Sequence, residues 1–186
     1  MDIHLDEYVY RNNGKILVAY YGDDTEVLIP LGVTWIDKGA FSSQLNITGV
    51  DITDKVEIID DSAFSNCVNL TSITMPDSVG YLGDRVFRNC IALESVKLSS
   101  NLGMICDETF IGCESLKSIV IPNSVRYIYE GAFRDCINLE SITIPSSVEE
   151  IKENAFLGCD KLVITTPKGS EAERYALANG IKVKLI

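Results

Sequence analysis

The chain has 186 residues, of which 46% are hydrophobic and 23% charged, and its formal net charge at pH 7 is −11. This hydrophobic content is typical of a folded protein and excludes a disordered chain. The acidic balance, without a cluster of Lys and Arg, argues against nucleic acid or an anionic membrane surface as a partner.

The first segment, Met1–Glu7, contains acidic residues and no apolar core, so it does not have the pattern of a secretory signal peptide. No apolar run is long enough to cross a bilayer, and membrane insertion is therefore not expected. Two interpretations of the compartment stay open: an intracellular protein, or a segment of a longer exported protein.

A β-hairpin is predicted near the N-terminus. Asn13-Gly14 separates the strand-like runs Tyr8–Tyr10 and Ile16–Tyr20. Asn-Gly between two such runs is the strongest short sequence signal for a hairpin. We expect residues 1–29 to form a β cap on the region that begins at Pro30.

From residue 30 onward the sequence is periodic. A phenylalanine recurs every 23 residues, at Phe41, Phe64, Phe87, Phe110, Phe133 and Phe156. Strict periods of this length are typical of solenoids, in which each coil buries its apolar face by stacking on its neighbours. We expect six coils over residues 30–168, continuous with the caps in one domain.

Other positions keep the same period and predict the local structure of a coil. In Leu139–Pro145 the last apolar pair alternates with period two, which indicates a short strand with one buried face, closed by proline. The spacing of Phe133 and Cys136 suits one face of a short helical turn. The preceding Val125–Ile128 is interpreted as a second extended segment.

The complete coil resembles a known family. Residues 125–145 read V-R-Y-I-Y-E-G-A-F-R-D-C-I-N-L-E-S-I-T-I-P. This is similar to the V-x-x-I-G-x-x-A-F-x-x-C-x-x-L-x-x-I-x-I-P coil of the BspA-type leucine-rich repeats, and the similarity covers about residues 27–168. It implies an α/β-type leucine-rich repeat solenoid, a right-handed curved stack of six coils with a parallel sheet on one face.

Five of the six cysteines occupy one column, three residues after a phenylalanine: Cys67, Cys90, Cys113, Cys136 and Cys159. Parallel side chains on coils about 4.8 Å apart place their Cβ atoms too far apart for a disulfide and do not converge on a zinc ion. We expect them to be reduced and buried as small apolar fillers. Cys106 lies outside the column and is expected to be the accessible thiol.

The C-terminal residues 169–186 are predicted to form a helix–strand cap. Leu162–Pro167 is one residue shorter than the equivalent segments, so Ile164 should take the inward position. Ser170–Glu173 has the form of a capping box, and Asn179-Gly180 is a typical helix end. A final strand is expected after it.

Nothing in the sequence predicts catalysis. The only histidine is His4, so the cysteines and serines of the repeats have no histidine base nearby. No phosphate-binding loop or zinc-binding helix motif is present. Acidic pairs such as Asp60-Asp61 and Glu149-Glu150 are interpreted as solvated faces. The chain is predicted to be non-enzymatic, with no cofactor or metal.

One candidate surface is the outward face of the predicted sheet. Its stacked columns include the hydroxyl column Ser72, Ser95, Ser118 and Ser141, and the charged residues Glu94, Lys97, Lys117 and Glu140. Small hydroxyl residues make a flat surface suited to protein or glycan contact. The alternative is that these residues only support the sheet through cross-strand pairs.

The second candidate is an aromatic stripe, which precedes the inward isoleucine column by one residue and consists of Trp35, Ile58, Tyr81, Met104 and Tyr127. Aromatic anchors of this kind are enriched in the cores of interfaces. The alternative is that a twist of the second extended segment half-buries them. If exposed, the stripe could bind a partner or a second copy of this chain as a weak homodimer.

Two functions follow as hypotheses. The resemblance implies an adhesion module of a cell-surface or secreted bacterial protein, which binds a protein, including one from a host or a cell surface, or a glycan. The missing signal peptide and unpaired cysteines instead suit an intracellular scaffold or structural spacer.

Overall fold

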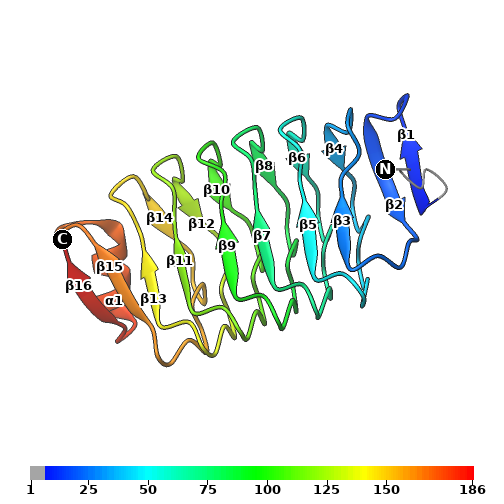
Figure 1. The fold of residues 1–186 in the computed structure, drawn as a ribbon. Helices are drawn as coiled ribbons and strands as arrows, with labels where there is room; N and C mark the ends of the chain where they lie inside the picture. The colour runs from blue at the N-terminus through cyan, green and yellow to red at the C-terminus, as the bar shows by residue number, and fades with distance from the viewer. Residues whose placement is uncertain (1–6) are drawn as a thin grey trace.

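A computed structural model describes residues 7–186 as a solenoid of stacked coils (Figure 1). Each coil contributes one strand to each of two rows of parallel strands. The first row, here called the long-strand face, consists of β3 (Glu26–Leu28), β5 (Gly49–Asp51), β7 (Ser72–Thr74), β9 (Ser95–Lys97), β11 (Ser118–Val120), β13 (Ser141–Thr143), β15 (Val163–Thr166) and β16 (Lys182–Leu185). The second row, the short-strand face, consists of β4 (Trp35–Ile36), β6 (Ile58–Ile59), β8 (Tyr81–Leu82), β10 (Met104–Ile105), β12 (Tyr127–Ile128) and β14 (Glu150–Ile151).

The strand register follows the sequence period. Ile73 of β7 is buried, while Ser72 and Thr74 on either side of it are exposed, as the period-two pattern predicts. Ser72 pairs with Ser95 and Ile58 with Tyr81, so residues 23 positions apart lie side by side. The stacked columns of the sequence are therefore columns in space.

The third side of each coil is a row of turns that carry the phenylalanines. Backbone N–H groups in one turn donate to carbonyls in the next, as from Phe87 to Thr109 at 2.9 Å and from Phe110 to Ala132 at 2.8 Å. Arg85 and Glu108 have φ of 58° and 52°, a left-handed conformation that interrupts a right-handed helix. The predicted helical turn is thus a series of tight turns, and within residues 7–186 the α-helix lies in the C-terminal cap.

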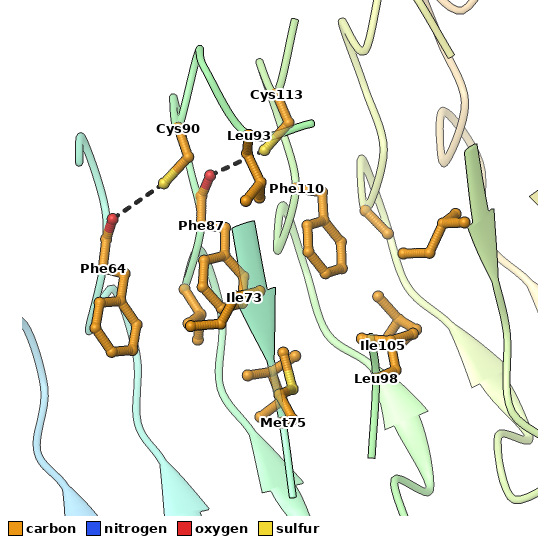
Figure 2. Close-up of a cluster of buried hydrophobic side chains, with 14 of the residues drawn as sticks. Phe64, Ile73, Met75, Phe87, Cys90, Leu93, Leu98, Ile105, Phe110 and Cys113 are labelled. Carbon is orange, nitrogen blue, oxygen red and sulfur yellow. Dashed lines mark hydrogen bonds between the residues drawn. The ribbon is translucent and has the colours of Figure 1, made fainter. Parts of the chain in front are cut away.

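The phenylalanine rings form a continuous stack inside the solenoid, part of which Figure 2 shows. Successive centroids are 5.0–5.7 Å apart and the rings are nearly parallel. Tyr20 continues the stack in front of Phe41 at 5.3 Å, and Tyr175 closes it with an edge contact to Phe156 at 5.9 Å. The phenylalanine stack is therefore one column that both caps complete.

The N-terminal hairpin is confirmed. β1 (Tyr8–Arg11) and β2 (Ile16–Tyr20) pair in antiparallel fashion, and the turn between them includes Asn13 and Gly14, both at positive φ. β2 then pairs in parallel with β4, so the hairpin covers the first coil.

The C-terminal cap has the predicted elements. Ser170 Oγ accepts a hydrogen bond from Glu173 N at 3.1 Å and so caps α1 (Glu171–Ala178), which ends before Gly180 at φ 70°. β16 adds to β15 in parallel. Ile164 is fully buried, as the shortened last coil predicts.

Strand pairing is interrupted once on each face. The short-strand face divides between β8 and β10, and the long-strand face divides between β9 and β11. Both interruptions lie between the same two coils, and hydrogen bonds between the turns of these coils continue there, as from Phe87 N to Thr109 O at 2.9 Å. The turn side and the phenylalanine stack form the uninterrupted part of the solenoid.

Candidate interaction surfaces

The cysteine column belongs to the core. All six cysteines are free and buried. Each column thiol donates to the carbonyl of the phenylalanine in the preceding coil, as from Cys90 Sγ to Phe64 O and from Cys113 Sγ to Phe87 O, both at 3.2 Å (Figure 2). They are therefore hydrogen-bond donors as well as fillers, a role that the spacing alone does not indicate.

The prediction that Cys106 is accessible was wrong. Its exposed fraction is 6%, and burial raises the pKa of its thiol to about 12. Burial likewise raises the pKa of Cys67 to about 12. These thiols stay protonated near neutral pH and are poor nucleophiles.

The long-strand face presents the predicted columns to solvent. Its four serines, Ser72, Ser95, Ser118 and Ser141, are exposed, as are Glu94, Lys97, Lys117 and Glu140. Within residues 7–186 none of these four charged side chains forms an ion pair. Val120, in the column of Lys97, is 65% exposed. The surface is flat, mixed in charge and open.

The aromatic stripe lies along the short-strand face and is only partly open. Tyr81 is 43% exposed, whereas the other four members are half-buried. Trp35 Nε1 donates to Asp60 Oδ2 at 3.2 Å, and the Tyr127 hydroxyl donates to Glu149 Oε2 at 3.3 Å. Tyr81 is thus the most accessible side chain of the stripe.

Beside the stripe runs an acidic column, of which the pattern of acidic pairs indicated only Asp61. It consists of Asp61, Asp84, Asp107 and Glu130, each 23 residues after the last. Asp61 Oδ1 accepts a hydrogen bond from Asp84 N at 3.0 Å, and Asp107 Oδ1 accepts one from Glu130 N at 2.9 Å. These carboxylates bridge successive coils, and the 23-residue period was the signal that would have found them.

A further apolar column lies one residue after the cysteine column, whose first position is occupied by Gln44. Leu45, Ile91 and Ile137 are 58%, 42% and 46% exposed, Val68 between them is half-buried, and Glu114 interrupts the series. Scattered exposed apolar residues are common on folded proteins. This column is therefore a weaker candidate surface than the stripe.

A cavity of about 320 Å³ lies at the C-terminal end, between the last turn and α1. Its lining includes Cys159, Asp160, Tyr175 and Lys182.

His4, named above in the search for a catalytic base, lies outside the described residues. Among residues 7–186 no helix is long and apolar enough to span a membrane.

Comparison with known families agrees with this architecture. The family model of the BspA type leucine-rich repeat region matches six copies over residues 34–163. The chain belongs to this family. No curated protein matches the chain.

Solved structures of leucine-rich repeat proteins are similar. The leucine-rich repeat protein of T. pallidum has a TM-score of 0.84 and 25% identity, over 99% of this chain and 98% of that one. A leucine-rich repeat protein from Eubacterium ventriosum has a TM-score of 0.73 and 25% identity, over 82% of this chain and 50% of that one. A leucine rich cell surface protein from Faecalibacterium prausnitzii has a TM-score of 0.54 and 27% identity, over 82% of this chain and 62% of that one. Family and neighbours together support a repeat module for protein interaction.

Proposed function

We propose that this chain is a non-enzymatic adhesion module, part of a bacterial cell-surface protein that binds a protein or glycan through the long-strand face or the aromatic stripe. The observation that carries the proposal is the contrast between inward and outward columns. The inward column is Phe in every coil, whereas one outward column reads Thr74, Lys97, Val120 and Thr143. Packing does not require this outward variation, so it is available for recognition.

The surface location is supported by one structural neighbour. The similar protein from Faecalibacterium prausnitzii is described as a leucine rich cell surface protein. This supports the same location for the present chain.

The second candidate function is an intracellular scaffold or spacer. The observation in its favour is that the six cysteines are free. Extracellular proteins often contain disulfides, whereas cytosolic thiols are kept reduced. The burial of these thiols also protects them from oxidation, and for this reason we place the scaffold second.

The two functions are separated by a binding screen with matched surface variants. The immobilised protein is tested against a glycan array and a panel of purified surface proteins, and Kd is measured for each hit. The stripe variant Tyr81→Ser/Tyr127→Ser and the long-strand variant Lys97→Ser/Val120→Ser are compared with the parent. Loss of an interface anchor should weaken a specific hit by about tenfold in one variant and leave it intact in the other.

Hits that bind the parent and both variants equally would contradict recognition by either face. An absence of hits would instead favour the spacer.

A further inference from the structure

The short-strand face places aromatic and acidic side chains side by side. Trp35 of the aromatic stripe donates a hydrogen bond to Asp60, which immediately precedes Asp61 of the acidic column. Around Tyr81, burial and the neighbouring acidic groups, Asp61 and Asp84 among them, raise the pKa of the phenol. The stripe and the acidic column are therefore parts of one surface.

The negative charge of this surface is only partly neutralised within the described chain. Lys38 contacts Asp61 at 3.4 Å, but Arg85 pairs with Glu108 at 2.8 Å and not with its neighbour Asp84. Within residues 7–186 Asp84, Asp107 and Glu130 form no ion pair. Burial, together with the like charges of Asp61 and Asp107 in the adjacent coils, raises the pKa of Asp84.

The surface is also open next to its most exposed aromatic residue. Gly80 and Gly103 precede Tyr81 and Met104 in the two central coils. A Cβ atom built on either glycine would meet nothing within 4 Å. No side chain therefore fills the space at these two glycines, and Tyr81 beside them is 43% exposed.

We propose that this face binds an extended, arginine- or lysine-rich segment of a partner protein, an inference that rests on the proposed recognition function. Cations stack on aromatic rings, and guanidinium groups form paired hydrogen bonds with carboxylates. Coils about 4.8 Å apart spread the four members of the acidic column over about 14 Å, the length of roughly five residues of extended chain. Unpaired carboxylates favour a cationic partner over a neutral glycan, because a buried charge without a counter-charge is costly.

The probe is a fluorescein-labelled octapeptide of alternating Arg and Ser, which presents its cations on one side when extended. Its affinity is measured by fluorescence anisotropy at low and at physiological ionic strength, beside peptides with Lys or Glu in place of Arg. The test variant is Asp84→Asn/Asp107→Asn, because Asn keeps the size of Asp and, at position 107, an oxygen that can accept the N–H of Glu130. The charge-matched control is Glu94→Gln/Glu140→Gln on the long-strand face.

We expect the Arg peptide to bind more tightly than the Lys peptide and the Glu peptide not to bind. The Asp84→Asn/Asp107→Asn variant should weaken binding about fivefold, as the loss of two partly exposed ion pairs implies. Tyr81→Ser should weaken it about threefold through the lost cation–π contact. The long-strand control should bind as the parent does.

An equal loss in the two charge variants would overturn the proposal, because it would reveal only general attraction to an acidic protein. No peptide binding by the parent would also overturn it. If a hit from the binding screen still depended on Tyr81, the recognition function would stand while the basic partner would not. A change in molecular mass of Tyr81→Ser by light scattering would assign the face to a second copy and overturn the proposal as well.

Discussion

Each phenylalanine of the stack contacts an aromatic ring on both sides. This contact explains why the 23-residue spacing of the phenylalanines is so strict. Phe110 lies between Phe87 at 5.4 Å and Phe133 at 5.2 Å and is fully buried. Nearly parallel rings at these distances fill the space between coils without a void. A residue of another size would leave a cavity or push the coils apart.

Phe110→Ala should lower the free energy of unfolding by about 3–5 kcal/mol, because it leaves a cavity in the middle of the stack. Urea denaturation followed by circular dichroism measures the loss. Phe41→Ala should cost a similar amount, since Tyr20 takes the position of a preceding phenylalanine. A clearly smaller loss at Phe41 would mean that the hairpin does not continue the stack in solution.

Among the elements, the turns connect the coils more continuously than the strands do. In most coils the backbone N–H of the residue that follows the leucine column donates to the preceding coil, as from Glu140 N to Lys117 O at 2.9 Å. On the short-strand face Tyr129 N donates to Ile105 O at 2.9 Å. The equivalent N–H groups of Lys117 and Cys106 make no such bond, which coincides with the interruptions of strand pairing.

This difference predicts local amide exchange rates. The N–H groups of Lys117 and Cys106 should exchange with deuterium faster than those of Glu140 and Tyr129, which occupy the same positions one coil later. Residue-resolved NMR exchange measures the four rates in one experiment. Equal protection in each pair would show that the strand rows are continuous in solution.

At the scale of the whole molecule, stability depends on groups that are buried in their protonated form. Burial raises the pKa of Cys67 and Cys106 to about 12, and burial also raises the pKa of Tyr20 to about 12. In the unfolded chain the thiols ionise near pH 9. The unfolded state therefore loses protons first as the pH rises.

Stability should accordingly be complete below about pH 9 and fall as the pH rises towards 12, because ionisation of the unfolded thiols favours unfolding. Each such thiol contributes about 1 kcal/mol of loss by pH 10. Urea midpoints at pH 7, 8, 9 and 10 follow the decline, and Cys106→Ser should flatten it. A midpoint that stays constant to pH 10 would contradict the burial of these thiols.

The sequence by itself determined the architecture of the coil. The spacing of Phe64, Phe87 and Phe110 predicts stacking, and the alternation around Ile73 predicts which face is buried. Both caps were also predictable, because Asn13-Gly14 and Ser170–Glu173 are local signals whose physics involves only a few neighbouring residues. The family resemblance carried the same information for the whole repeat region.

Only the tertiary structure decided what happens between coils. It assigned the thiol of Cys90 to the Phe64 carbonyl, buried Cys106, and left Tyr81 as the exposed member of the stripe. It also placed that stripe beside the acidic column, because Trp35 donates a hydrogen bond to Asp60, the residue before Asp61. These features depend on distances and angles between residues about 23 positions apart, and a periodic pattern gives the order of such residues but not how closely their side chains approach.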